Sequence, residues 1–329
     1  MTIATTPRNK RNEDSHIDEG VWDLEDLEDK VIKPAQWGQV APKVYKAFSA
    51  THSKLPAGVY AITMERNEET PLYIKSDVKN DALIRFKGSL GDQIIREIDT
   101  FWEKRKRFAE MKFLHRRGYL LHGGAGTGKT SLVRQIVEVV VADGGIVLLC
   151  ENPKFFNKGL AVFRQTEPDR NLVCVFEDID AIVKRYGDDE LLSILDGTNM
   201  VDRVLNIATT NFPEVLDKRI VARPRRFDRI IKVTSPEESV RLEFLKNKLP
   251  KGEDIDNWMR KTEGLSFASI AEAIISVCCL DNELDKTIKI LENIEHNQPS
   301  SEESKGKVGF GAVAKDDDDD DDDDDVNPR

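Results

Sequence analysis

The sequence predicts an α/β fold, in which a parallel five-stranded sheet is flanked by helices, with a small α+β module before it and helices after it. Short apolar runs typical of buried strands recur between residues 119 and 233, and they alternate with segments of helical periodicity. A glycine-rich loop follows the first of these runs, at residues 123–130. Beyond residue 235 only helical periodicity remains, so we expect a helical unit, or lid, at residues 235–295.

Composition divides the rest of the chain. Residues 1–20 are polar and aperiodic, and residues 296–329 are rich in Ser, Glu, Lys and Gly and then in aspartate, so we expect both to be disordered. Residues 21–88 form the expected α+β module, and residues 89–234 form the α/β domain. Within the module, residues 59–62 and 72–74 have the pattern of short strands, whereas Trp37, Val44 and Tyr45 lie in segments of helical character.

The loop at residues 123–130 reads Gly-Gly-Ala-Gly-Thr-Gly-Lys-Thr, and it lies between a strand-like run at 119–121 and a helical pattern at 131–141. It fits GxxxxGKT, in which backbone N–H groups surround phosphate oxygens, the lysine reaches the β- and γ-phosphates and the threonine ligates magnesium. The sequence therefore predicts a P-loop NTPase fold. The expected phosphate-binding residues are Gly123, Gly124, Ala125, Gly126, Thr127, Gly128, Lys129, Thr130 and Ser131.

Two later strands end in polar residues. After a strand at 145–150, the apolar run 172–176 leads directly into Glu177 and Asp178. Carboxylates at the end of a buried strand are where a P-loop fold holds magnesium and positions the attacking water. The next strand, 204–208, is followed by Thr209, Thr210 and Asn211, and we expect Asn211 to help order that water.

Arginines are concentrated just before the fifth strand. The segment 223–229 reads Arg-Pro-Arg-Arg-Phe-Asp-Arg, and the strand follows at 230–233. Beside a nucleotide fold, such a segment suggests charge stabilisation of a transferring phosphoryl group. The alternative is a cluster of surface salt bridges.

Taken in this order, the motifs of residues 98–282 resemble those of the AAA branch of the AAA+ ATPases. Within that branch, His115-Arg116-Arg117-Gly118-Tyr119 and the order Glu177-Asp178 are most similar to the mitochondrial complex III assembly translocase and its soluble bacterial and phage relatives. The resemblance implies ATP hydrolysis to ADP and phosphate, with Mg²⁺ as the metal.

The resemblance also implies individual roles. Lys129 and Thr130 would bind phosphates and Mg²⁺, Glu177 would take the metal side, and Asp178 would activate the water. Asn211 matches the sensor asparagine. Arg223 and Arg226 match the paired arginine fingers, which in this family reach the neighbouring protomer's nucleotide. That arrangement implies a homo-oligomeric ring, usually a hexamer.

Several positions depart from the family pattern. Asp178 is one methylene shorter than the usual glutamate, which bears on the rate because water positioning depends on hydrogen-bond reach. Arg225 stands where the family often has glycine, and residues 264–268 match the lid motif only in part. Phe155 and Phe156 lie where unfoldases carry an aromatic pore loop. The alternative is that these two side chains pack a helix onto the sheet.

Net charge is −11, but the run of ten aspartates at 316–325 accounts for most of it, and without that run the charge is −1. The run is interpreted as a solubilising end, a lure for a basic partner or a mimic of nucleic-acid phosphate. A basic run at 104–107 reads either as a solvated helix face or as a nucleic-acid stripe. A near-neutral folded part disfavours tight nucleic-acid binding, because Lys and Arg contacts to phosphate dominate that affinity.

The location expected from the sequence is cytoplasmic. Cysteines 150, 174, 278 and 279 show no disulfide spacing, which favours a reducing compartment, and no apolar run approaches the length that spans a membrane. We expect a soluble, ring-forming ATPase that remodels a protein not identified by the sequence. The alternatives are a DNA-metabolism loader and a nucleotide-gated scaffold with negligible turnover, the latter motivated by Asp178.

Overall fold

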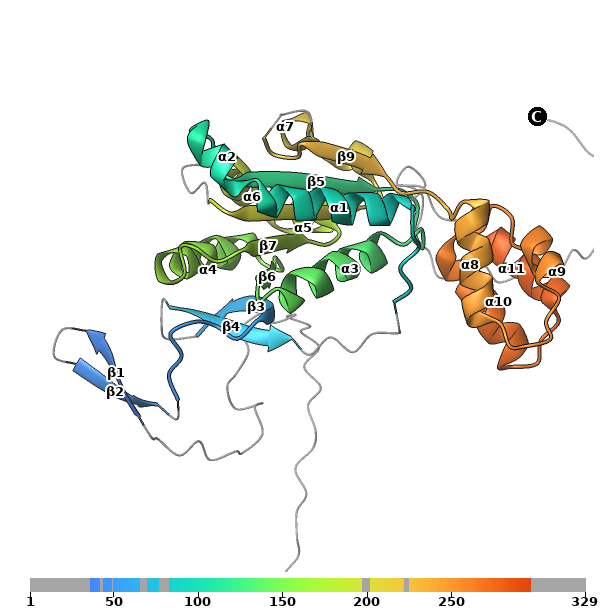
Figure 1. Cartoon of the computed structure of the whole chain (residues 1–329), viewed down its shortest axis with the longest axis horizontal. Helices are drawn as coiled ribbons and strands as arrows, with labels where there is room; N and C mark the ends of the chain where they lie inside the picture. Colours follow the sequence, from blue (N-terminus) through green and yellow to red (C-terminus); the bar gives the residue numbers. More distant parts are fainter. Residues whose placement is uncertain are drawn as a thin grey trace, which may run out of the picture.

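A computed structural model describes residues 36–41, 44–48, 50–65, 70–76, 83–196, 202–221 and 225–296. An α/β unit occupies the centre, a group of helices lies beyond one end of its sheet, and a small two-stranded sheet lies near β3 and β4 (Figure 1). The predicted arm at 1–20, the tail from 297 onward and Arg223 lie outside the described residues.

The main sheet has seven strands within the described residues, in the order β4-β3-β6-β7-β8-β5-β9. Their bounds are β3 Gly58–Met64, β4 Pro71–Ser76, β5 Arg116–His122, β6 Ile146–Leu149, β7 Leu172–Phe176, β8 Val204–Thr210 and β9 Arg229–Lys232. All neighbours are parallel except β3 and β4, which form an antiparallel pair. The predicted five strands are present, but the count of five is wrong, because the two strand-like runs assigned to the N-terminal module extend the same sheet.

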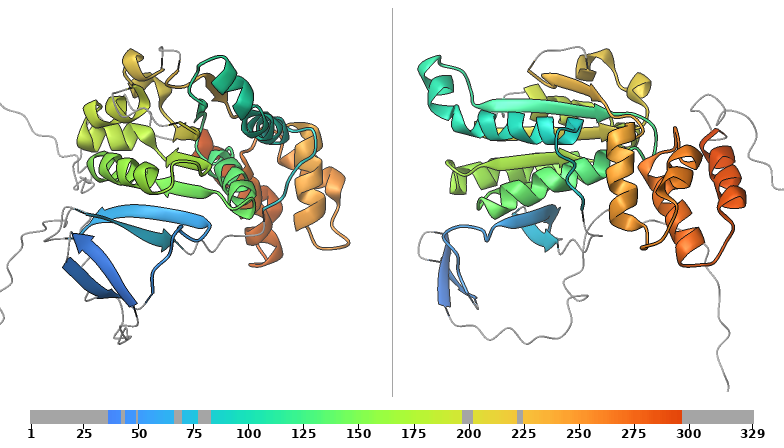
Figure 2. Two further views of the ribbon diagram at one scale, coloured as in Figure 1. Left: turned by 60° about the vertical axis from the view of Figure 1, so that its left-hand side comes forward. Right: turned by 45° about the vertical axis from the view of Figure 1, so that its right-hand side comes forward.

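Helices cover both faces of this sheet (Figure 2). On one face lie α4 Pro153–Thr166, α5 Ile179–Tyr186 and α6 Asp189–Asp196, and on the other lie α1 Leu90–Glu103 and α3 Lys129–Ala142. The two sides alternate along β7, where Leu172, Cys174 and Phe176 join the first core and Val173 and Val175 the second. Shorter helices are α2 Arg105–Glu110, η2 Pro213–Val215 and α7 Lys218–Val221. The prediction of a mainly parallel α/β fold is confirmed.

The C-terminal helices form a second core. They are α8 Glu238–Lys248, α9 Ile255–Lys261, α10 Phe267–Cys278 and α11 Leu284–His296. Leu245, Trp258 and Ile270 are almost fully buried at their centre. Ile84 and Phe86, which precede α1, pack against the same cluster, so the helical unit contacts the segment before α1 as well as following β9 in the chain.

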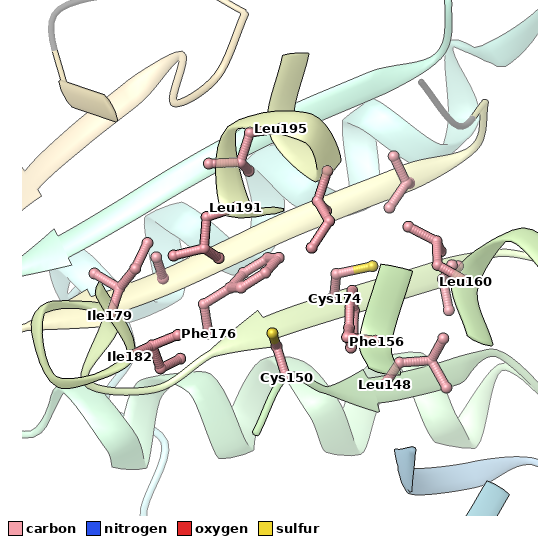
Figure 3. Close-up of a cluster of buried hydrophobic side chains, with 14 of the residues drawn as sticks. Leu148, Cys150, Phe156, Leu160, Cys174, Phe176, Ile179, Ile182, Leu191 and Leu195 are labelled. Carbon is pink, nitrogen blue, oxygen red and sulfur yellow. The ribbon is translucent and has the colours of Figure 1, made fainter. Parts of the chain in front are cut away.

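Two expectations about the aromatic residues are resolved by the structure. Residues Gln36–Ala41 (β1) and Val44–Phe48 (β2) pair as antiparallel strands, so the helical character expected around Trp37, Val44 and Tyr45 is wrong. Phe156 is 1% exposed and lies on α4, with its ring centroid 5.5 Å from that of Phe176 (Figure 3). The pore-loop interpretation is therefore wrong for Phe156, and the helix-packing alternative is confirmed.

No helix within the described ranges combines the length and the hydrophobicity needed to cross a bilayer.

Candidate functional site

The sheet brings the predicted site residues to one edge. Because β5, β7 and β8 are parallel, their carboxyl ends lie together, with Phe176 opposite Ala208 and with His122 opposite Thr210. The glycine loop follows β5, Glu177 and Asp178 follow β7, and Asn211 follows β8. Three segments far apart in the chain therefore meet at the same end of the sheet.

The glycine loop has a backbone that other residues would not adopt without strain. Gly126 and Gly128 are left-handed, with φ of 74° and 99°, and Gly123 has φ of 151°. A β-carbon on Gly123 would also lie 2.0 Å from the carbonyl oxygen of Val233, which follows β9. Only glycine fits at these positions. The Thr127 hydroxyl donates to the Gly124 carbonyl at 2.9 Å and closes the loop on itself.

Lys129 begins α3 and points back into this loop. Its ammonium donates to the carbonyl oxygens of Gly123 at 2.8 Å and Gly124 at 2.7 Å, and the residue is 6% exposed. Burial lowers the pKa of Lys129, while Asp178 and Asp180 act in the opposite direction. The cation therefore lies within electrostatic reach of the carboxylates that follow β7.

Thr130 and Ser131 follow Lys129 in the first turn of α3, and both are exposed. The first four backbone N–H groups of a helix have no partner within the helix and attract anions. Together with the glycine loop, this helix start has the donors that phosphate oxygens require.

Glu177 and Asp178 form the turn between β7 and α5. Partial burial raises the pKa of Glu177, Arg134 on α3 lowers it, and the neighbouring Asp178 raises it further. A carboxylate whose charge is disfavoured by burial gains from a nearby cation, and this is the environment in which Mg²⁺ would be bound. Asp178 has φ of 46°, and its N–H donates to the Thr209 hydroxyl at 3.0 Å, which fixes the turn onto β8.

The structure adds a contact that the sequence did not predict. The Thr210 hydroxyl donates to Asp180 at 2.5 Å and accepts the N–H of Phe212 at 3.0 Å, and Thr210 is fully buried. Asn211, between these two residues, is half-buried at the strand end. The sequence contains both residues, since Asp180 lies two residues after Asp178 and Thr210 directly precedes Asn211. Their contact is not predictable from the sequence, because it depends on β7 and β8 being neighbours in the sheet.

The helical unit touches the glycine loop through the start of α10. The N–H of Ala268 donates to the Gly126 carbonyl at 3.2 Å. A β-carbon on Gly126 would lie 2.8 Å from both the Ala268 β-carbon and the Ser266 hydroxyl, and one on Gly128 would lie 3.3 Å from the Phe267 ring. Phe267 in turn stacks on Phe86, with centroids 5.8 Å apart. Residues 264–268 match the lid motif only in part, and the sequence does not predict the contact of Ala268 with Gly126.

Of the two predicted arginine fingers, only Arg226 lies within the part of the chain that the structure describes, and Arg223 lies outside it. Arg226 is 5% exposed, and its guanidinium donates to the carbonyl of Arg219 in the same chain. Arg225, at the position where the family often has glycine, is exposed with φ of 76°. The chain thus keeps a glycine-like backbone at Arg225 and directs the Arg226 side chain inward.

Comparison with known proteins agrees with this geometry. Residues 119–235 match the "ATPase family associated with various cellular activities (AAA)". The chain is 31% identical over 183 residues to Protein SAV of Sulfolobus acidocaldarius, an alignment covering 48% of this chain and 23% of that protein. It is 28% identical over 225 residues to the ATP-dependent zinc metalloprotease FtsH of Magnetococcus marinus. That alignment covers 61% of this chain and 33% of the relative.

A third relative is the proteasome-activating nucleotidase of Methanococcus vannielii, 30% identical over 209 residues that cover 57% of this chain and 51% of the relative. The chain thus spans about half or less of the length of these relatives. The match at 119–235 contains the glycine loop, the turn after β7 and the end of β8. It supports the predicted AAA domain over these residues.

Proposed function

We propose that this chain, whose residues 119–235 form an AAA domain, is a ring-forming ATPase that couples ATP hydrolysis to the remodelling of a protein. The observation that carries the proposal is the meeting of the glycine loop, Glu177–Asp178 and Thr210–Asn211 at one sheet edge, with α10 bonded to the loop. This arrangement supports a role for each of these segments in binding or hydrolysing the nucleotide.

Nucleotide binding would use the loop and the start of α3. The backbone N–H groups of residues 123–131 would surround the phosphates, and Lys129 would exchange its two carbonyl partners for phosphate oxygens. No group of three or more His, Cys, Asp or Glu side chains among the described residues could hold a metal alone. Thr130 and Glu177 would therefore hold Mg²⁺ together with phosphate oxygens, and the bound ion would neutralise charge on the β- and γ-phosphates.

Hydrolysis would proceed by in-line attack of water on the γ-phosphorus, with the bond to the β–γ bridging oxygen breaking and ADP leaving with inorganic phosphate. Asp178 would orient this water and accept its proton, and Asn211 would hold it from the end of β8. The bond from the Asp178 N–H to Thr209 fixes the backbone from which the short carboxylate must reach. A residue one methylene shorter than glutamate depends more strongly on such fixed backbone geometry.

A ring would complete the site. Arg223 and Arg226 would stabilise charge on the transferring phosphoryl group from the neighbouring protomer, an effect worth about 10³ to 10⁵ in rate where arginine fingers have been measured. For Arg226 this requires its guanidinium to exchange the Arg219 carbonyl for the neighbour's phosphate. We propose a hexamer as the ring size.

The helical unit would act as the lid. Its contact with Gly126 lies within the phosphate-binding loop, so a change in loop conformation is transmitted to α10 without an intervening segment. Phe267 extends this contact to Phe86 and to Phe244 on α8, with centroids 5.4 Å apart in the second pair. Nucleotide turnover would thereby move the helices relative to the sheet.

A protein target is favoured by two observations. The relatives include a proteasome-activating nucleotidase and an ATP-dependent metalloprotease, and the charge without the aspartate run is −1, which gives little general attraction for nucleic acid. Within the family, we propose from His115–Tyr119 and the Glu177-Asp178 order that the chain resembles the translocase-like members. The buried free thiols of Cys150 and Cys174 support a reducing, cytoplasmic location.

The alternative of a nucleotide-gated scaffold has one specific observation in its favour, which is the short carboxylate of Asp178. A scaffold would bind ATP and assemble without turnover. A DNA loader is the other alternative, and salt-dependent binding to DNA would identify it.

The proposal is tested by phosphate release with Mg²⁺ and ATP, with the mass of the assembly measured by light scattering in each nucleotide state. Lys129→Ala should lose ATP binding, and Asp178→Asn should bind ATP but not hydrolyse it. Arg226→Ala should bind and assemble without turnover. Lys154→Ala serves as the control, because Lys154 is exposed in the first turn of α4 and has no role in the proposed site. Wild-type protein that binds ATP and assembles with no turnover, even with candidate targets present, would instead establish the scaffold.

A further inference from the structure

A cavity separate from the proposed nucleotide site lies between α1, α2 and the strands β5 and β9, which lie side by side in Figure 1. Its volume is about 620 Å³. The charged side chains that line it are Arg96, Glu97, Lys104, Arg117 and Arg229, so four cations face one carboxylate. We refer to this cavity and these five residues as the basic groove.

Part of the positive charge in the basic groove is already neutralised. Arg229 pairs with Glu97 at 3.2 Å, and Arg96 pairs with Asp92 at 3.2 Å on the same helix. Lys104 and Arg117, in contrast, make no ion pair with any other residue that the structure describes, and Arg117 lies beside the Tyr119 hydroxyl. These two cations remain available to an anion, and the paired ones add to the positive potential around it.

We propose that the basic groove binds the chain's own acidic segment, Asp316–Asp325. This segment has ten consecutive carboxylates and accounts for the change in net charge from −1 to −11. An extended peptide of aspartates presents carboxylates at short, regular intervals, which matches a surface where cations come from α1, β5, β9 and the junction between α1 and α2. The same proposal explains why Lys104 and Arg117 lack a carboxylate partner among the described residues.

The length of chain between the two parts permits this contact. Helix α11 ends at His296, and residues 297–315 separate it from the first aspartate. A chain of this length reaches about 65 Å when extended and has a mean end-to-end distance of roughly 25 Å when flexible. A folded unit of this size has a radius of gyration of about 18 Å, so the extended linker is long enough to span such a unit.

Tethering also decides between this occupant and other polyanions. A segment held by a linker that can reach its site has an effective concentration on the order of 1 mM there. To displace the segment, a free polyanion of equal affinity, such as single-stranded DNA, must exceed that concentration. The acidic segment would therefore compete with nucleic acid and with acidic proteins for the basic groove.

The first test uses a fluorescent peptide of ten aspartates and two full-length chains, the wild type and a variant with all ten aspartates of 316–325 changed to asparagine. The asparagine variant should bind the peptide roughly tenfold more tightly than wild type, because no tethered competitor remains. Binding should weaken steeply as salt rises from 50 to 500 mM. Equal affinities of the two chains would overturn the proposal.

The second test locates the site. In the asparagine background, Lys104→Gln with Arg117→Gln should abolish the gain in peptide affinity. Lys154→Gln with Lys158→Gln, two exposed lysines of α4 on the opposite face of the sheet, should leave it unchanged. If the Arg117 variant fails to fold, Arg96→Gln with Lys104→Gln replaces it, since both of these side chains are exposed. Peptide binding that survives in the groove variants overturns the proposal.

The third test examines the contact without added peptide. Hydrogen exchange of residues 90–110 should be slower in wild type than in the asparagine variant at low salt, and the difference should be independent of protein concentration. Unchanged exchange overturns the proposal. If the asparagine variant instead gains binding to single-stranded DNA through Lys104 and Arg117 but not to the peptide, the basic groove is a nucleic-acid site and the acidic segment is not its ligand.

Discussion

The hydroxyl of Thr210 donates to the carboxylate of Asp180 across a distance of 2.5 Å and so joins the end of β8 to the first turn of α5. Both residues lie within two positions of proposed catalytic groups, Asn211 on one side and Asp178 on the other. Neither is proposed to touch the nucleotide. Their contact fixes the relative position of the two segments that carry the proposed water-positioning residues.

Thr210→Val should therefore lower both stability and turnover. Loss of the hydroxyl leaves Asp180 and the Phe212 N–H without their partner, which should cost about 1 to 3 kcal/mol of the free energy of unfolding. Thr210→Ser keeps the hydroxyl and should restore most of both. Urea denaturation and phosphate release measure the two effects, and equal turnover in the valine and serine variants would contradict the positioning role.

Gly126→Ala should abolish nucleotide binding. Its left-handed φ of 74° disfavours alanine by about 1 to 2 kcal/mol, and the added β-carbon would also overlap Ala268 and Ser266 of the helical unit. Gly144→Ala is a matched control, because Gly144 has φ of 80° and nothing within 4 Å of the added atom. Fluorescent-nucleotide titration should show normal affinity for Gly144→Ala only.

Phe156→Ala should destabilise the whole α/β unit rather than affect a threading step. The side chain is 1% exposed and packs against Phe176, so its loss should cost about 3 to 5 kcal/mol. Phe113→Ala, with a side chain that is 54% exposed, should change stability by less than about 0.5 kcal/mol. Chemical denaturation distinguishes the two, and a Phe156→Ala variant as stable as wild type would contradict the packing role of this side chain.

Stability should fall as pH drops from 7 to 5, in part because of His115. Burial lowers the pKa of His115, although its hydrogen bond to the Phe101 carbonyl and the charge of Asp202 act in the opposite direction. His115 therefore binds a proton more readily in the unfolded chain than in the folded protein. The free energy of unfolding is highest above pH of about 6.5 and decreases as the pH falls, by up to about 1.4 kcal/mol per pH unit.

His115→Phe keeps the stacking on Phe101, whose ring centroid lies 4.0 Å from that of His115, and removes the titration. Denaturation of both proteins at pH 7 and pH 5 should give a smaller loss for the variant. Burial also lowers the pKa of His122, so a residual slope is expected. An unchanged slope in His115→Phe would exclude His115 as a source of the acid sensitivity.

Thiol reactivity should divide the four cysteines. Cys150 and Cys174 are buried, and burial raises the pKa of both thiols, that of Cys174 to about 12. Cys279 is exposed, and Cys278 is half-buried with a raised pKa. In native protein at pH 8, the thiol of Cys279 should react rapidly with a disulfide reagent, and that of Cys278 should react more slowly. The other two should react only in denaturant.

Features built from contiguous residues were predictable from the sequence. Three such features are the glycine loop, the turn at Glu177–Asp178 and the break between α5 and α6 near Gly187. Each depends on local residue types and on the spacing of apolar residues along a single strand or helix. The five parallel strands were predictable for the same reason, since each is a short apolar run.

Features that depend on pairing between distant segments were not predictable. β3 and β4 have the pattern of strands, but nothing within 58–76 indicates that β3 lies beside β6, whose partner residues are about 90 positions later. The contact of Ala268 with Gly126 and the bond of Thr210 to Asp180 likewise require the assembled fold. Arg225 is a different case, because a positive φ at arginine contradicts the local preference and is determined by its surroundings.

The order of strands in the sheet bears on how the chain is made. β5 carries the glycine loop at its end, yet its two neighbours, β8 and β9, are synthesised last among the strands. At ribosomal rates of about 5 to 20 residues per second, on the order of 10 s pass between His122 and Lys232 leaving the peptidyl-transferase centre. A nucleotide at the proposed site therefore could not assist the folding of the nascent chain until nearly the whole α/β unit has emerged. During that interval β5 would have two unpaired edges that a chaperone would need to cover.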